Sequence, residues 1–296
     1  MLDYAALAAL AAVVREGSFD GAARTLHVTP SAVSQRIRAL EERVGCALVV
    51  RDQPCRATAV GQRLCQHVEQ VRLLEHELRD ALPLPGAQAG TRVTLSVAVN
   101  ADSLATWFAP AVAAYAARAP VLLDIAVDDE SHTAQWLHSG AVLAAVSAQP
   151  RPPSGCNTVP LGSMRYVAAA SPAFIARHFS AGVGAASLAQ APSLMFSTKD
   201  ELQARWVRRR CRRDVELPRH LLPSPQAFVS AALAGMGWGM HPQALVAGHL
   251  RSGALAELVP GTTLDVALHW HHARAASTLL ESLTAAVRAA ARAALQ

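Results

Sequence analysis

The sequence predicts a small, mainly helical N-terminal domain, a long connecting helix and a larger C-terminal α/β domain. Residues 1–60 contain short helical patterns separated by turn signals. One long helical pattern runs from Thr58 to about Leu82 and ends at the prolines and glycine of residues 83–86. From about Thr91 onward short β-type runs alternate with helical segments, which is typical of an α/β domain.

Composition limits the class of protein. The 296 residues exceed one average domain, and 52% hydrophobic residues supply material for buried cores. Lys199 is the only lysine, so the net charge of +5 rests on arginine and fits a polyanionic partner, although alone it carries little weight. Five cysteines without CxxC spacing indicate free thiols in a reducing compartment. The run Ala5–Val14 lacks the features of a signal peptide, and no apolar stretch reaches the ~20 residues that span a bilayer, so we expect a cytoplasmic protein without membrane contact.

The segment 19–41 predicts two short helices joined by a turn. Phe19, Ala22, Ala23 and Leu26 share one face of the first helix, and Ser18 or Asp20 can cap its start. Residues 27–30 then end the first helix, and the proline at position 30 favours the start of a second helix, residues 31–41. Val33, Ile37 and Leu40 form the inward face of this second helix. Its free face carries hydroxyl, amide and guanidinium groups, which can bond base edges and phosphates in a major groove. A helical hairpin with a solvated polar face is the alternative.

A predicted β-hairpin follows the second helix. Residues 45–51 indicate a helix stop and a strand, and residues 56–58 a returning strand. Such a wing can bring arginines to backbone phosphates or to a minor groove. We therefore predict a winged helix-turn-helix with these candidate DNA contacts: Thr29, Pro30, Ser31, Ser34, Gln35, Arg36, Arg38, Arg51 and Arg56.

The long helix predicts self-association. Apolar residues recur along it at three- and four-residue intervals: Val60, Leu64, Val68, Val71, Leu74 and Leu78. A second copy of the same helix could cover this seam, which would give a dimer with two DNA-reading helices on a two-fold site. Packing on its own domain is the alternative.

The α/β region carries seven predicted strands: 93–99, 121–127, 142–147, 166–170, 193–196, 238–240 and 266–270. Helices are expected from Ala101 or Asp102, over 132–138 and 226–235, and over 277–295. Ligands gather at the carboxyl ends of the strands in open α/β sheets, so residues 100–103, after the first strand, mark a candidate site.

Residues 18–51, with Thr58–Gly61 after them, resemble the N-terminal domain of LysR-type transcriptional regulators. The resemblance implies a winged helix-turn-helix, a linker helix and a two-lobed α/β effector domain similar to periplasmic binding proteins. Residues 95–107 look like the start of the effector domain in the ArgP/LysG branch, with further likeness at 128–130, 140–142 and 268–270. Members of that branch sense lysine and arginine and usually activate a gene that exports basic amino acids. Some also inhibit initiation of replication.

The resemblance implies a division into a DNA-binding domain (1–60), a linker helix and hinge (61–90) and an effector-binding domain (91–296). Lobe I would take about 91–163 and 267–296, and lobe II about 164–266. The implied partners are double-stranded DNA, lysine or arginine as a small-molecule effector, a second copy in a homodimer or homotetramer, and RNA polymerase. No cofactor, metal ion or enzymatic activity is expected.

Candidate effector contacts follow from the chemistry of a basic amino acid. Its carboxylate could meet Ser103 and free backbone N–H groups, and its cationic groups Asp102 or Glu130, with Asp128 and Asp129 next. Ser147 could add a hydroxyl, and His241 stands where the branch has asparagine or another small polar group. Asn100 completes the set of effector candidates, Asn100, Asp102, Ser103, Glu130, Ser147 and His241. Alternatively, Asp102 only caps a helix and residues 128–130 form a solvated turn.

Other classes of function have less support. An α/β region can host catalysis, but the chain has no GxSxG, no P-loop and no GxGxxG after a strand. His269, His271 and His272 lack a nearby cysteine or carboxylate at metal-ligand spacing. Nothing near Cys156 or Cys211 suggests a lowered thiol pKa for a redox switch. A regulator with a different effector, and a replication-control or nucleoid-type DNA binder, remain alternatives.

Overall fold

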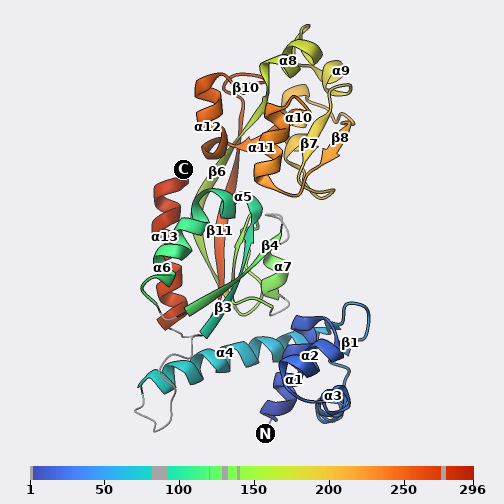
Figure 1. Ribbon diagram of the computed structural model, residues 1–296, viewed down its shortest axis with the longest axis vertical. Coiled ribbons are helices and arrows are strands. Elements are labelled where there is room, and N and C mark those ends of the chain that lie inside the picture. Colours follow the sequence, from blue (N-terminus) through green and yellow to red (C-terminus); the bar gives the residue numbers. More distant parts are fainter. Residues whose placement is uncertain (1–2, 82–92, 120, 129–132, 139–140, 275–277) are drawn as a thin grey trace.

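A computed structural model describes the chain except residues 1–2, 82–92, 120, 129–132, 139–140 and 275–277. The N-terminal domain lies at one end, the helix α4 (Ala59–Ala81) runs across the molecule next to it, and two stacked lobes form the rest (Figure 1). No helix among the described residues is long and apolar enough to cross a membrane.

Three helices and a small hairpin form the N-terminal domain: α1 (Tyr4–Glu16), α2 (Phe19–Thr25), α3 (Pro30–Val44), β1 (Val49–Val50) and β2 (Arg56–Ala57). The short apolar run near the N-terminus is α1, whose inward face carries Leu7, Leu10 and Val13. These residues pack with Ala22 and Ala23 of α2 in one buried core. These small residues of α2 allow close approach of the neighbouring helices.

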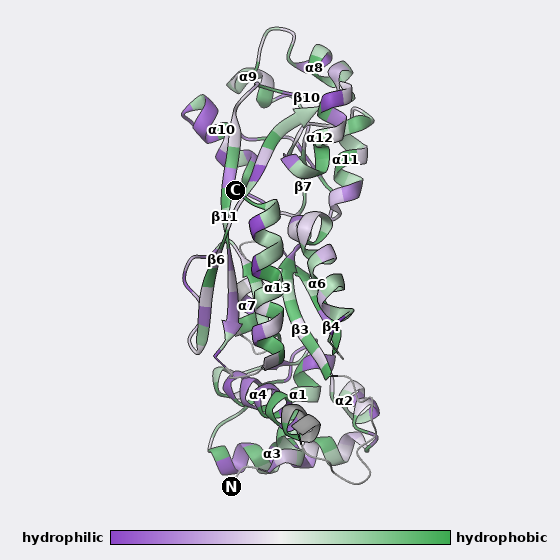
Figure 2. Ribbon diagram, turned by 90° about the vertical axis from the view of Figure 1, so that its left-hand side faces the viewer, coloured by the Kyte–Doolittle hydropathy of each residue, from purple (hydrophilic) through white to green (hydrophobic). Residues whose placement is uncertain are grey.

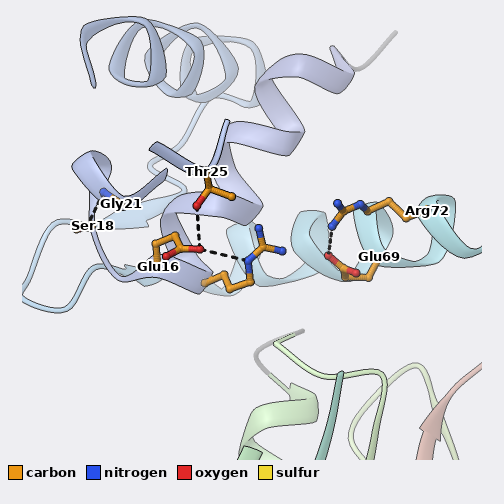
Figure 3. Close-up of polar contacts among 7 residues, drawn as sticks. Glu16, Ser18, Gly21, Thr25, Glu69 and Arg72 are labelled. Atoms are coloured by element: carbon orange, nitrogen blue, oxygen red, sulfur yellow. Dashed lines mark hydrogen bonds and ion pairs between the residues drawn. The ribbon is translucent and has the colours of Figure 1, made fainter. Parts of the chain in front are cut away.

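Local hydrogen bonds set the helix starts and the turn between α1 and α2. Ser18 caps α2, since its Oγ accepts a hydrogen bond from Gly21 N at 3.0 Å. Thr25 Oγ1 donates to Glu16 Oε1 at 3.2 Å and ties the last turn of α2 to the end of α1 (Figure 3). The position of α2 is therefore set by polar contacts at both of its ends and by the apolar core beneath it.

Helix α4 contacts both halves of the molecule. Thr58 caps its start, since its Oγ1 accepts a hydrogen bond from Gly61 N at 3.2 Å. Val68 is buried in the core of the N-terminal domain, whereas Leu73 is buried in the core of the two-lobed domain. Gln66 Nε2 donates to the carbonyl of Leu137 at 3.2 Å, which adds a polar link to the same domain. Part of the predicted seam thus packs on its own chain, while Val60, Leu74 and Leu78 stay exposed.

One seven-stranded mixed sheet runs through both lobes, in the order β10-β6-β11-β5-β3-β4, with β9 also paired to β6. Lobe I holds β3 (Val93–Asn100), β4 (Val121–Asp128) and β5 (Ala144–Ser147), and β3 pairs with both neighbours in parallel. The long strands β6 (Cys156–Ala170) and β11 (Thr263–Ala273) pair antiparallel and connect lobe I to lobe II (Figure 1).

Helices cover the sheet in lobe I. They are α5 (Ala101–Ser103), the π-helix η1 (Leu104–Phe108), α6 (Ala109–Ala116), α7 (Thr133–His138) and α13 (Thr278–Ala294). Helices α6 and α13 lie side by side in both views (Figures 1 and 2). The hydroxyl of Tyr115 on α6 donates to the carbonyl of Leu279 on α13 at 2.9 Å, which links the two helices.

Lobe II is built around a two-stranded parallel sheet, β7 (Ser193–Met195) with β8 (Arg219–Leu221), and the short strands β9 (Gly239–Pro242) and β10 (Ala256–Glu257). Its helices are α8 (Pro172–His178), α9 (Ala185–Leu188), α10 (Leu202–Cys211), α11 (Pro225–Leu233) and α12 (Gln243–Ser252). Trp206 and Trp238 are buried in its core with ring centroids 5.5 Å apart.

The predicted strand 166–170 is too short, because β6 begins ten residues earlier at Cys156. Pro160 and Gly162 interrupt the β-type pattern in that stretch. Gly162 has φ +119, and the pairing with β11 shifts register between Leu268 and His269. The irregularity hides the continuous strand from a pattern of alternating residues.

Candidate DNA-reading helix and effector cavity

Helix α3 is the predicted reading helix, and its start is built from Thr29 and Pro30. Thr29 Oγ1 accepts from Ala32 N at 3.2 Å, and Pro30 occupies the first helical position. Val33, Ile37 and Leu40 are buried, which turns the opposite face outward. Thr29 Oγ1 and Ser31 Oγ lie 2.9 Å apart, so the two hydroxyls share a hydrogen bond at the free end of the helix.

The predicted contact residues of α3 lie together on its free side. Ser31, Gln35 and Arg38 are exposed, and Ser34 and Arg36 are half-buried. Within the described part of the chain neither Arg36 nor Arg38 has an ion-pair partner. The free guanidinium and amide groups are the donors and acceptors that base edges require.

The wing carries the other two predicted arginines. Val50 pairs with Arg56 across β1 and β2, and Arg51 follows directly after β1. Both arginines are exposed. The guanidinium carbon of Arg51 lies 5.1 Å from the centre of the Phe19 ring, so α2 orients this side chain.

A cavity lies where the end of β3 in lobe I meets β9 and other parts of lobe II. Three predicted effector residues, Asn100, Asp102 and His241, line it together. The remaining lining residues come from both lobes: Ala101, Asp128, Phe196, Asp200, Leu202, Pro225, Phe228, Met240, Pro242 and Leu245. No arginine or lysine is among these described lining residues.

The cavity shifts the pKa of the Asp102 carboxylate. Burial raises its pKa from the usual 3.8 to about 6, a hydrogen bond from the Tyr166 hydroxyl lowers it, and the charge of Asp200 raises it. The Tyr166 hydroxyl donates to Asp102 Oδ2 at 2.8 Å. Asp102 is thus not the cap of its helix, since Asn100 holds that position and makes no side-chain capping bond.

Two polar side chains of the cavity are buried with their polar atoms unpaired. Both side-chain atoms of Asn100 and both ring nitrogens of His241 make no hydrogen bond within the described chain. Burial lowers the pKa of His241 to about 4, against an opposing influence of the Ala169 carbonyl, so the imidazole is neutral at physiological pH. Buried unpaired groups cost free energy, and a ligand that bonds to them would recover it.

Sequence reasoning missed Asp200 and Tyr166. Asp200 lies just beyond β7, where Phe196 N and Leu202 N donate to its carboxylate at 3.0 Å each. The rule that drew attention to Asn100, polar residues after the carboxyl end of a strand, applies equally to Asp200 in the second lobe. Tyr166 carried no signal of its own, because its place opposite Asp102 depends on how β6 crosses between the lobes.

Two predicted effector residues, Ser103 and Ser147, are not among the described cavity-lining residues. Ser103, the last residue of α5, is fully buried, and its Oγ has no partner in the described chain. Ser147 is buried at the end of β5 and accepts a hydrogen bond from Gln149 N at 3.1 Å. Glu130, like Asp129, lies outside the described residues. Asp128 does line the cavity, and Trp136 Nε1 donates to its Oδ2 at 3.0 Å.

The alternative functional sites, a histidine metal site and a cysteine redox switch, gain no support from the described residues. His269 and His271 stack with ring centroids 6.1 Å apart, and His271 Nε2 lies 2.8 Å from the Gln149 carbonyl oxygen. Among the described residues no three His, Cys, Asp or Glu side chains are arranged to hold a metal ion. Burial raises the pKa of the Cys156 thiol, which disfavours the reactive thiolate.

Two family models match the chain. The model described as "Bacterial regulatory helix-turn-helix protein, lysR family" matches residues 4–62, and the one described as "LysR substrate binding domain" matches residues 88–292. The chain belongs to the LysR family.

Known relatives and solved structures are similar to this chain over nearly its whole length. It is 46% identical over 291 residues to the "HTH-type transcriptional regulator LysG" of Mycobacterium tuberculosis, covering 98% of this chain and 94% of that protein. The crystal structure of ArgP from Mycobacterium tuberculosis matches with a TM-score of 0.86 at 44% identity, over 100% of this chain and 99% of that one. Full-length LysG from Corynebacterium glutamicum with bound effector Arg matches all of both chains, with a TM-score of 0.76 at 34% identity.

These matches confirm the predicted fold class. The regulator has an N-terminal helix-turn-helix domain and a two-lobed effector domain, as the ArgP and LysG structures do. It is a DNA-binding transcription regulator and not an enzyme. The resemblance to the ArgP/LysG branch is likewise confirmed.

Proposed function

We propose that the cavity between the lobes binds a basic amino acid, L-arginine or L-lysine, and that this effector controls the regulator's binding to DNA. The observation that carries the proposal is the charge of the cavity: Asp102, Asp128 and Asp200 line it without a compensating arginine or lysine among the described lining residues. Carboxylates held close together in a buried site favour a cationic ligand.

The cationic end of the effector belongs near Asp102 and Asp200. The charge of Asp200 raises the pKa of Asp102, so the two carboxylates repel each other. A guanidinium or ammonium group between them would remove this repulsion and gain charge-assisted hydrogen bonds. Tyr166 holds Asp102 in place for that contact.

The carboxylate end of the effector belongs near Asn100 and His241. The Asn100 amide and one His241 ring nitrogen are hydrogen-bond donors without a partner in the described chain. The neutral imidazole serves as a donor without placing a charge in the cavity. Phe228, whose ring lies 5.1 Å from that of His241, orients the imidazole. The Arg bound to the related LysG of Corynebacterium glutamicum supports the effector class.

Calorimetric titration of the purified regulator tests the effector. L-arginine or L-lysine should bind, and Asp102→Asn should weaken the tighter of the two at least tenfold. Citrulline, which has the shape of arginine without its charge, is the matched ligand control and should bind much more weakly. Absence of heat from both basic amino acids would exclude this effector class and favour a LysR regulator with another ligand.

For DNA we propose that the free side of α3 enters the major groove and that Arg51 and Arg56 of the wing contact the backbone. Gln35→Ala and Arg36→Ala should each weaken specific operator binding by about 1–3 kcal/mol per lost bidentate base contact. Arg43→Ala, at the end of α3, is the control on the same helix. Unchanged operator affinity in both test variants would exclude direct base contacts by these residues.

We further propose that the exposed part of the α4 seam pairs with a second copy of the chain. Val60, Leu74 and Leu78 are large apolar side chains left in solvent on one long helix. Exposed apolar residues along one helix are stabilised by burial against an apolar partner, and the same helix in a second copy of the chain presents the same residues. Residues 61–90, which we predict to be the linker helix and hinge, would then connect the 1–60 and 91–296 domains; residues 82–90 of this range lie outside the described residues.

A further inference from the structure

The positive charge of the chain is concentrated away from its DNA-reading domain. Residues 1–60 hold seven arginines against six acidic residues, which leaves them almost neutral. The fifteen residues from Arg205 to Arg219 hold seven arginines against one aspartate and one glutamate. This short stretch therefore has a net charge of +5, equal to that of the whole chain.

Seven exposed arginines lie in this stretch of lobe II, and together we call them the arginine face: Arg205, Arg208, Arg209, Arg210, Arg212, Arg213 and Arg219. The first four lie on α10, the next two directly after it and the last on β8. Figure 2 shows α10 at the outer edge of lobe II with mostly hydrophilic colouring. All seven side chains belong to exposed residues.

Little of this charge is neutralised within the chain. Arg208 Nε pairs with Asp214 at 2.7 Å, and Arg209 Nη1 donates to the Thr263 carbonyl at 3.4 Å. The other five arginines have no ion pair or side-chain hydrogen bond in the part of the chain that the structure describes. Like charges gathered in this way raise the free energy of the free protein, and an anionic partner would lower it.

The surface chemistry distinguishes between polyanionic partners. A protein interface has an apolar centre from which charged residues are depleted. On α10 the large apolar residues Leu202, Trp206 and Val207 are buried in lobe II, so that this helix offers charge without an apolar centre. A nucleic-acid backbone needs only repeated cationic donors, and the guanidinium fork fits a phosphate with two hydrogen bonds.

Length and position also fit duplex DNA. Ten residues make α10 about 15 Å long, which is about the rise of four base pairs. Helices α10 and α3 lie at opposite ends of the molecule (Figure 1), so one short duplex cannot contact both helices of the same protomer.

We propose that the arginine face of lobe II is a second DNA-binding surface, which holds the phosphate backbone of a duplex without sequence preference and independently of α3. A protomer could then hold its operator at one end and a second segment of DNA at the other. The inference goes beyond the proposed function, because it needs neither the effector nor base contacts by α3.

The number of duplexes bound by each protomer tests this proposal. A 12-base-pair duplex of unrelated sequence is titrated at low salt into the full-length regulator, and the stoichiometry is followed by sedimentation. We expect two duplexes per protomer for the wild type and one for the double variant Arg210→Gln, Arg213→Gln. The double variant Arg288→Gln, Arg292→Gln removes two exposed arginines from α13 and should still bind two. Thermal unfolding of each variant verifies that the fold is intact.

Two further measurements sharpen the result. The double variant Gln35→Ala, Arg36→Ala should retain the weaker sites on the arginine face. For these sites the logarithm of the binding constant should fall with the logarithm of the salt concentration, with a slope of about 0.9 for each phosphate contact. One duplex per protomer in the wild type, or equal losses in the α10 and α13 variants, would overturn the proposal. Displacement of the duplex by poly-L-glutamate at equal charge concentration would also overturn it, since the surface would then prefer carboxylates.

Discussion

Effector binding should weaken as pH falls, because Asp102 takes up a proton in the same range. Its pKa is raised to about 6 by burial, so that at pH 7 the carboxylate is mostly ionised and at pH 5 it is mostly protonated. A protonated Asp102 cannot attract a guanidinium or ammonium group. His241, with a pKa lowered to about 4, stays neutral across this window and does not contribute.

The size of the effect follows from the pKa. With one proton to remove at a pKa of about 6, the apparent Kd should rise about tenfold between pH 7 and pH 5, or about 1.4 kcal/mol. The arginine guanidinium keeps its charge throughout, because its pKa lies above about 12. The ligand therefore does not cause the change.

Isothermal titration with L-arginine at several pH values measures this dependence, and buffers of different ionisation enthalpy report the proton released on binding. Asp102→Asn should flatten the profile. Tyr166→Phe should move its midpoint upward, since the lost hydrogen bond lowers the pKa of Asp102 in the wild type. A Kd that is equal at pH 5 and pH 7, or lower at pH 5, would refute the role given to Asp102.

Three other predictions concern stability and assembly. Because the pKa of Asp102 is raised, the folded state without effector keeps a proton that the unfolded state loses between about pH 4 and pH 6, so the free energy of unfolding falls as pH rises through that window. Asp102→Asn should therefore raise the Tm at pH 7 but not below pH 4. An equal change in Tm at both pH values would contradict the raised pKa of Asp102. Leu74→Asp with Leu78→Asp should dissociate the dimer in sedimentation, since these side chains are 50% and 58% exposed in one chain, whereas Leu221→Asp on lobe II should not. Gly61→Ala should lower the free energy of unfolding of the N-terminal domain in urea by about 2 kcal/mol or more, because the added Cβ would clash with the Leu48 carbonyl. Gly248→Ala, in α12 with open space around it, should raise the free energy of unfolding by about 0.5–1 kcal/mol. The reverse order would contradict the close packing at Gly61.

The sequence predicts the DNA-binding domain well, because its signals are local. Thr29 and Pro30 mark the start of α3 through a cap and a preset backbone angle, and Thr58 marks the start of α4 through a cap. The cavity is predicted only in part. Asn100, Asp102 and His241 line it, but Asp200 reaches it from the other lobe.

The missed features depend on contacts between distant segments. Tyr166 meets Asp102 only because β6 crosses from one lobe to the other, and no periodicity records that crossing. Ser147 follows a strand end as Asn100 does, yet it does not line the cavity and is hydrogen-bonded to its own loop. Which strand ends face the cavity is decided by sheet order, which a single sequence does not display.

The most direct test of the central claim is the regulator's affinity for its operator, measured by fluorescence anisotropy with and without saturating L-arginine or L-lysine. In the wild type one of these amino acids should change operator affinity, and Asp102→Asn should abolish that change at the same ligand concentration while keeping the affinity measured without ligand. Equal operator affinity with and without both amino acids, or a full response in Asp102→Asn, would contradict control of DNA binding through this cavity.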